Sequence, residues 1–129
     1  MKRVGVVGFS SQVFDEDVAR DILTKALSKY QEPIMVVSGL TMLGIPKIAY
    51  EIASVMGWKT AGYACSDAEN YECFPVDEKH IVGENWGDES DAFLAGIDEM
   101  IKVGGGPQSE REFASFEGPK VEFGLDAIS

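Results

Sequence analysis

Apolar residues occur along this chain in two alternating patterns. Short runs that are apolar throughout, or at every second position, are typical of buried strands and cover residues 4–10, 34–37, 58–65 and 97–103. Residues 79–82 indicate a further, shorter strand. Apolar residues spaced three and four apart are typical of helices and cover residues 15–30 and 46–56, with a weaker helical pattern over residues 88–96. Residues 67–72 could form one helical turn, and past Ser115 the pattern leaves only one helical turn and a short tail.

The order of these elements predicts the fold class. Strand, helix and strand in alternation favour right-handed crossovers and a parallel sheet covered by helices on both faces. We therefore expect an α/β protein with a three-layer Rossmann-like fold and a mostly parallel sheet of four or five strands. The chain has 129 residues and shows no repeat or linker, so residues 1–129 are expected to form a single domain.

Three consecutive glycines, Gly104, Gly105 and Gly106, lie between the strand at residues 97–103 and a helix. Ser109 can act as the N-cap of that helix, with Glu112 three residues later in the spacing of a capping box. Glycines let the backbone approach a ligand closely, and a helix N-terminus presents free N–H groups and a positive dipole end to an anion. A tight turn that needs glycine dihedrals is the alternative explanation.

A second stretch of this kind, residues 38–46, also follows an apolar strand and precedes a helix. The first strand ends in small residues as well. The carboxyl ends of parallel strands meet at one edge of a sheet, where ligands bind. We expect a phosphate-bearing ligand to lie there, and the expected binding residues are Gly8, Ser10, Gly39, Leu40, Thr41, Gly44, Gly104, Gly105, Gly106, Gln108 and Ser109.

Charge and composition exclude several partners. The formal net charge is −11 and the isoelectric point about 4.4, so the surface should repel nucleic-acid backbones and anionic membranes. No apolar run approaches the roughly 20 residues of a membrane helix, and no signal peptide is evident, so we expect a cytoplasmic protein. Cys65 and Cys73 are then expected to be free thiols, and with a single histidine no metal site is predicted. The absence of a Gly-Lys-Ser or Gly-Lys-Thr sequence excludes a P-loop enzyme.

The stretch Gly104-Gly105-Gly106-Pro107-Gln108-Ser109-Glu110-Arg111-Glu112 resembles the Pro-Gly-Gly-x-Gly-Thr-x-x-Glu motif of the Lonely Guy phosphoribohydrolases. Residues 38–46 are similar to the second glycine loop of the same Rossmann-like superfamily, which includes molybdenum-cofactor carrier proteins and DNA-processing protein A. The resemblance implies nucleotide binding, frequent dimers, and a catalytic role for the glutamate aligned with Glu112.

The chain departs from that motif at three places. Gln108 replaces a glycine and Gly104 replaces the proline. The hydrolases also carry a catalytic arginine upstream, whereas residues 86–90 contain no arginine and have Glu89 instead. A carboxylate there would repel a ribose phosphate rather than bind it. The resemblance therefore implies ligand binding more directly than hydrolysis.

The sequence leaves three hypotheses. The first is a nucleotide-binding protein that senses, carries or sequesters its ligand without a further cofactor. The second is a phosphoribohydrolase-like N-glycosidase acting on nucleoside monophosphates, with Glu112 as the catalytic carboxylate rather than a helix cap. The third is a structural subunit in which the glycines only shape turns.

Two further expectations concern surfaces. Trp86 and Tyr71 could stack on a base or cover the edge of the core. Limited helix cover of the sheet predicts a homodimer or higher homo-oligomer, shared through the second and last helices and their apolar side chains Tyr50, Met56, Phe113 and Phe116.

Overall fold

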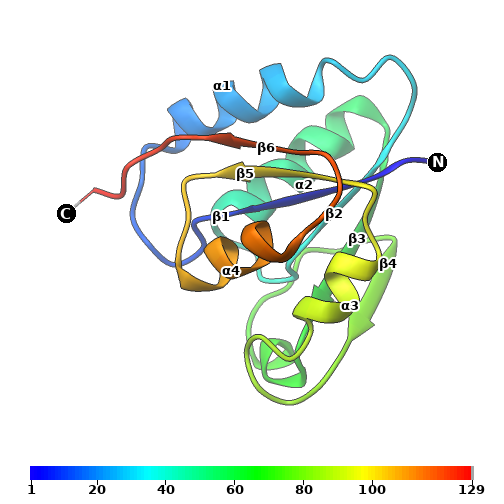
Figure 1. Ribbon diagram of the computed structural model, residues 1–129, viewed down its shortest axis with the longest axis vertical. Coiled ribbons are helices and arrows are strands. Elements are labelled where there is room, and N and C mark those ends of the chain that lie inside the picture. Colours follow the sequence, from blue (N-terminus) through cyan, green and yellow to red (C-terminus); the bar gives the residue numbers. More distant parts are fainter. Residues whose placement is uncertain (129) are drawn as a thin grey trace.

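The computed structural model describes residues 1–128, which form one six-stranded sheet in the order β4-β3-β2-β1-β5-β6 (Figure 1). Every pair of neighbouring strands is parallel. The strands are β1 (Arg3–Gly8), β2 (Met35–Ser38), β3 (Lys59–Ala64), β4 (Glu78–Ile81), β5 (Glu99–Val103) and β6 (Lys120–Phe123).

The predicted count of four or five strands is wrong, because β6 lies in the segment expected to be a tail. Lys120, Val121 and Glu122 are exposed, so β6 lacks the continuous apolar run that identifies a buried strand. It is an edge strand that pairs with β5 through its backbone, in the register Ile101 opposite Val121.

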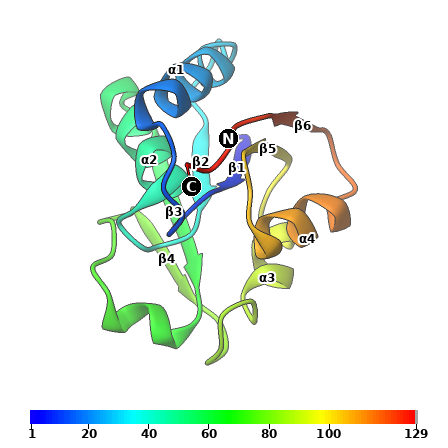
Figure 2. The same cartoon turned by 90° about the vertical axis from the view of Figure 1, so that its left-hand side faces the viewer.

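The helices cover both faces of the sheet, which confirms the three-layer Rossmann-like arrangement (Figure 2). Helices α1 (Glu16–Leu27) and α2 (Gly44–Met56) pack on one face, and α3 (Ser90–Ala95) and α4 (Pro107–Ser115) on the other. A 3-10 turn, η1 (Ser66–Asn70), follows β3. The central strand β1 is buried on both sides, with Val4 and Val6 in one core and Val7 in the other.

Local signals explain most helix boundaries. The Asp15 side chain accepts hydrogen bonds from the backbone N–H groups of Asp17 and Val18, so α1 begins directly after it. Gly57 adopts a left-handed conformation, φ 75°, and ends α2 as expected. Helix α2 begins at Gly44, two residues before the predicted start at Pro46.

The expected capping box at α4 is wrong. The helix begins at Pro107 with Gly106 as its N-cap, so Ser109 already lies inside the first turn. Proline has a fixed φ that suits the first helical position, and it sets the start of the helix ahead of the serine. The Ser109 hydroxyl instead donates to the Gly8 carbonyl oxygen at 3.0 Å. Glu112 is therefore free to turn toward the sheet edge.

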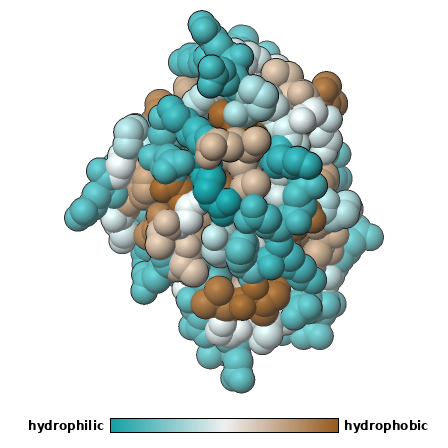
Figure 3. All heavy atoms as spheres, turned by 90° about the vertical axis from the view of Figure 1, so that its right-hand side faces the viewer, coloured by the Kyte–Doolittle hydropathy of each residue, from teal (hydrophilic) through white to brown (hydrophobic). Residues whose placement is uncertain are grey.

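The face of the molecule drawn in Figure 3 is mostly polar. On the side of the molecule in Figure 3, hydrophilic side chains predominate and apolar ones form smaller patches between them. Among residues 1–128, none of the helices is both long enough and apolar enough to cross a membrane.

Candidate functional site

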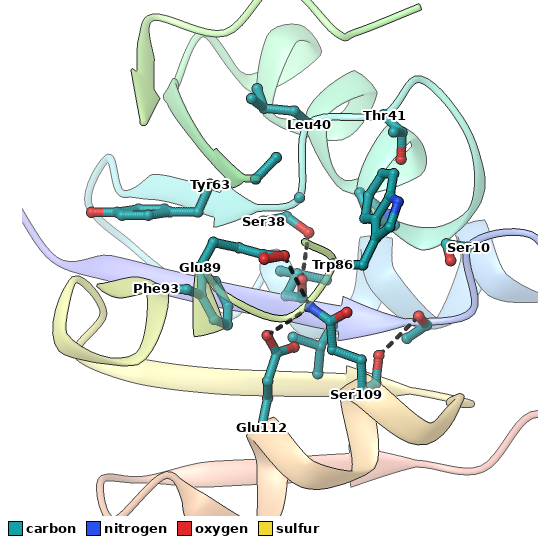
Figure 4. A pocket seen from close by; sticks show the side chains of 17 residues that line it. Ser10, Ser38, Leu40, Thr41, Tyr63, Trp86, Glu89, Phe93, Ser109 and Glu112 are labelled. Atoms are coloured by element: carbon teal, nitrogen blue, oxygen red, sulfur yellow. Dashed lines mark hydrogen bonds between the residues drawn. The ribbon is translucent and has the colours of Figure 1, made fainter. Parts of the chain in front are cut away.

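A pocket of about 130 Å³ opens at the carboxyl edge of the sheet (Figure 4). It lies where β1 adjoins β2 on one side and β5 on the other, which is the point at which the strand order reverses. The segments after β1 and β2, the end of β3, the loop before α3, and the first turns of α4 contribute its walls. The lining residues are Val6, Val7, Gly8, Ser10, Ser38, Gly39, Leu40, Thr41, Pro46, Tyr63, Ala64, Trp86, Glu89, Phe93, Gln108, Ser109 and Glu112.

Many of the residues predicted for the site do line this pocket. They are Gly8, Ser10, Gly39, Leu40, Thr41, Gln108, Ser109 and Glu112. Gly44, Gly104, Gly105 and Gly106 do not line it. The structure therefore brings the two predicted loops together but leaves four of their glycines outside the cavity.

These four glycines shape the loops instead. Gly44 has φ +68° and packs against the backbone of Phe9 and Ser10. Gly104 has φ +64° and lies against the ring of Phe9. A Cβ at Gly105 would meet the ends of the Lys102 and Glu110 side chains at 2.9 Å, and one at Gly106 would meet the Gln12 amide at 3.0 Å. Because these glycines have no side chain, the neighbouring segments can pack closely around the pocket.

Tyr50 on α2 holds the loop after β2 in place by hydrogen bonds. Its side chain is fully buried, and its hydroxyl lies 2.7 Å from the Gly39 carbonyl oxygen and 2.9 Å from that of Ala61. Burial raises the pKa of this phenol well above its ordinary value, so it remains a donor. Gly39 is held at the pocket wall with open space beside it: a Cβ there would have only Pro46 Cγ nearby, at 4.0 Å.

Two buried carboxylates, Glu89 and Glu112, face one another across the Gln108 amide (Figure 4). Gln108 Nε2 donates to Glu89 Oε1 at 3.2 Å and to Glu112 Oε2 at 3.3 Å. The Ser90 hydroxyl donates to the same Glu112 oxygen at 2.8 Å. Burial raises the pKa of Glu112, the Ser90 and Gln108 hydrogen bonds oppose that shift, and the nearby Glu89 charge adds to it.

This raised pKa predicts the effect of Glu112→Gln on stability. A carboxyl whose pKa is higher in the folded state binds its proton more tightly there, so stability falls as pH rises above the ordinary value of 4.5. Glutamine is neutral and can still accept from Ser90, so the variant should lose this pH dependence and melt at a slightly higher temperature at pH 7.5. Thermal melts between pH 4.5 and 8 measure both. Glu117→Gln, at an exposed position, is the control, and a lower Tm for Glu112→Gln at pH 7.5 would contradict the assignment.

The pocket contains side chains that the sequence did not identify, or identified only as alternatives. Ser38, Tyr63 and Phe93 are not among the predicted binding residues. Glu89 is predicted only to repel a phosphate, and Trp86 either to stack on a base or to cover the edge of the core. Glu89 is only 4% exposed although it lies in a polar stretch, and Trp86 is 50% exposed although it is apolar. Burial of a charged side chain and exposure of an aromatic one both mark candidate functional residues. The structure shows this burial and exposure, whereas the sequence pattern does not.

The residues that line the pocket include no lysine, arginine or histidine within the described part of the chain. Lys102 lies beside Gly105 and is paired at 2.9 Å with Glu110 and at 2.6 Å with Glu122. Burial lowers the pKa of Lys102, but these two carboxylates outweigh burial and hold the pKa above its ordinary value. An anion in the pocket would therefore depend on hydroxyls and backbone N–H groups.

Two expectations about sulfur and metals can be compared with the structure. Cys65 and Cys73 are free thiols, as predicted. Among residues 1–128, no group of three or more His, Cys, Asp or Glu side chains is arranged to hold a metal ion.

No protein-family model matches the chain, and no curated protein sequence does. Solved structures do match. The molybdenum cofactor binding protein of the phototrophic bacterium Rippkaea orientalis has a TM-score of 0.78 and 20% identity, over 97% of this chain and 77% of that one. The molybdenum cofactor carrier protein of Chlamydomonas reinhardtii has a TM-score of 0.74 and 21% identity, over 94% and 75%. TM1055, a structural-genomics target, has a TM-score of 0.68 and 20% identity, over 88% and 67%.

The chain shares their fold. The resemblance of the glycine loops to the superfamily that includes molybdenum-cofactor carriers is thereby confirmed at the level of architecture. At sequence identities of 20–21%, structural similarity shows a shared fold but not a shared ligand. The function therefore has to be argued from the pocket itself.

Proposed function

We propose that this protein binds a nucleotide, or a phosphate ligand derived from one, in the pocket at the carboxyl edge of its sheet, and that it senses, carries or sequesters that ligand. The observation that carries the proposal is that the loops after β1 and β2 and the first turns of α4 converge on a single cavity at the reversal of strand order. Open α/β sheets bind ligands at this position.

The phosphate would lie at the α4 end of the pocket. The first N–H groups of a helix have no partner within the helix, and the dipole favours an anion there. The hydroxyls of Ser10 and Ser109 line the same part of the cavity. The carboxylates of Glu89 and Glu112 lie farther along, where ligand hydroxyl or N–H groups can donate to them.

Two proteins of this fold are described as binding or carrying the molybdenum cofactor, which supports carriage of a small molecule as a role for such a chain. We place this role in the cytoplasm, a reducing compartment in which two free thiols persist.

Hydrolysis of an N-glycosidic bond is the second candidate function, and Glu112 is the observation that favours it. A buried carboxyl with a raised pKa, bonded to Ser90 and Gln108 beside a second carboxyl, is suited to general acid or base chemistry. Among residues 1–128, no cationic side chain lines the pocket, which argues against clamping of a ribose phosphate in the transition state.

One experiment separates the two functions. The protein is incubated with nucleoside monophosphates, bound ligand is detected by native mass spectrometry, and free base by liquid chromatography. Binding without release of base supports the proposal. Release of base by the wild-type protein, with a rate about 100-fold or more lower in Glu112→Gln, would establish the hydrolase instead. No binding and no turnover would contradict both.

Self-association is also part of the proposal. Of the side chains expected at a shared surface, Tyr50 and Phe116 are buried inside the chain and are excluded from that role. Phe113 is half-buried, whereas Met56 is 46% exposed and its neighbour Val55 is 88% exposed, so the end of α2 is the most exposed part of the predicted surface. We expect light scattering to give a dimer mass at high micromolar concentration and Val55→Glu to give a monomer. A monomeric native protein would contradict this expectation.

A further inference from the structure

The loop between β4 and α3, residues 83–89, holds an exposed tryptophan at the edge of the pocket. Trp86 Nε1 donates to Asp67 Oδ2 at 2.7 Å, so its only polar atom is satisfied and the orientation of its ring is fixed. The ring of Tyr71 lies 6.1 Å away, centroid to centroid. The indole is nevertheless 50% exposed and lines the cavity, on the side of Thr41 in Figure 4. A fixed aromatic surface of this kind is suited to stacking on a planar ring.

The backbone of the 83–89 loop is itself well ordered by hydrogen bonds. Asp88 Oδ2 accepts from the N–H groups of Glu84 and Asn85 at 3.0 and 2.9 Å. Gly83 and Gly87 have φ angles of 74° and 102°, which only glycine adopts readily. The loop therefore presents Trp86 in a defined position before any ligand arrives.

Three residues later the same loop places the buried carboxylate of Glu89 in the pocket, pointing inward in Figure 4. Glu89 accepts from Gln108 at 3.2 Å and from the Gly87 N–H at 3.2 Å. Each carboxylate oxygen has two lone pairs, so acceptor capacity remains. Glu112 adds a second acceptor, because both of its hydrogen bonds fall on Oε2. A ligand that approaches Glu89 therefore meets carboxylate oxygens that can accept further hydrogen bonds.

We infer that the 83–89 loop selects a ligand whose planar ring has two neighbouring N–H donors, a guanine-type ring, by stacking it on Trp86 and bonding its donor edge to Glu89. This inference rests on the proposed nucleotide function and names its substrate class. A guanine ring presents a ring N–H beside an amino group, which matches a carboxylate. An adenine ring presents an acceptor nitrogen beside its amino group. That nitrogen and the carboxylate oxygen are both acceptors, so they would repel each other and form no hydrogen bond.

The test compares three probes by isothermal titration calorimetry: guanosine monophosphate, adenosine monophosphate and ribose 5-phosphate, which has no ring base. The wild-type protein should bind guanosine monophosphate at least about tenfold more tightly than either other probe, because adenosine monophosphate loses the hydrogen bonds to a charged group and ribose 5-phosphate loses both these bonds and the stacked ring. Because removal of a charge can raise the affinity of every anionic probe, the ratio of affinities is the quantity compared between variants.

In E89Q the ratio of guanosine to adenosine monophosphate affinity should fall to about one, whereas E84Q, an exposed charge change in the same loop, should keep the wild-type ratio. In W86A the advantage of guanosine monophosphate over ribose 5-phosphate should disappear. In W58F, whose remaining tryptophan is Trp86, guanosine monophosphate should quench the indole fluorescence and ribose 5-phosphate should not.

The outcomes are distinguishable. Equal affinities for both nucleotides, a ratio unchanged in E89Q, or ribose 5-phosphate binding as tightly as the nucleotides would overturn ring recognition and leave phosphate binding in the pocket standing. No binding of any of the three probes would overturn the proposed function together with this inference.

Discussion

Replacing Gly39 with valine is expected to weaken nucleotide binding at least about tenfold while the protein stays folded. Gly39 lines the pocket, and a Cβ there has no heavy atom nearer than Pro46 Cγ at 4.0 Å, so a side chain can start there without a clash in the free protein. It would occupy space that the ligand needs, and a steric penalty above about 1.4 kcal/mol is tenfold in affinity. Titration calorimetry with guanosine monophosphate measures the loss, and a thermal melt measures the fold.

Gly124→Val is the matched control for this substitution. Gly124 is exposed and outside the pocket, and a Cβ added there would have no heavy atom within 4 Å. The same bulk added at this position should change neither affinity nor Tm. Gly39→Val with wild-type affinity and wild-type Tm would show that the ligand does not occupy this cavity.

Replacing Gly8 with alanine is expected to destabilise the fold by about 2 kcal/mol or more. Gly8 ends β1 opposite Val103 of β5, and a Cβ there would overlap the Val103 carbonyl oxygen. It would also meet Ile45 Cγ1 at 2.8 Å. A backbone carbonyl in the middle of a sheet cannot move as a flexible side chain can, so the strain has to spread through the β1–β5 pair.

Denaturant titration of Gly8→Ala beside Gly124→Ala measures this effect. The first variant should lose stability and the second should remain within about 0.5 kcal/mol of the native protein. Because Gly8 also accepts the Ser109 hydroxyl hydrogen bond at the pocket, ligand affinity should fall as well. A Gly8→Ala protein as stable as wild type would mean that β1 and β5 are not packed as described.

The sequence predicts those parts of the fold whose signals are local. The buried strands β1, β2, β3 and β5 lie in runs that are apolar throughout or at every second position, and Asp15 and Gly57 mark helix ends through their own hydrogen bonds and dihedrals. The edge strand β6 pairs with β5 through its backbone, and its alternation of apolar residues is too short and too exposed to identify it in the sequence. The start of α4 differs from the prediction because Pro107 and Ser109 both favour a helix beginning, and the proline prevails.

Some residues of the candidate site can likewise be predicted from local sequence signals, and others cannot. The loops after β1 and β2 can be identified because glycine and small residues follow apolar strands, and parallel strands bring such loops to one edge. Glu89 and Trp86 reach the pocket only through the path of residues 83–89, which follow the short edge strand β4 and have no periodic pattern. The hydrogen bond between Glu89 and Gln108 joins residues 19 positions apart and depends on α3 and α4 lying on the same face of the sheet (Figure 2).

Mapping of backbone amide shifts by NMR can locate a bound nucleotide residue by residue, since the chain is only 14.0 kDa. Guanosine monophosphate is titrated into the ¹⁵N-labelled protein. We predict that the largest shift changes fall on residues 39–41, on Glu89 and on Ser109, and that they saturate with a single dissociation constant. Changes confined to residues outside the pocket, or none at millimolar nucleotide, would contradict nucleotide binding at the carboxyl edge of the sheet.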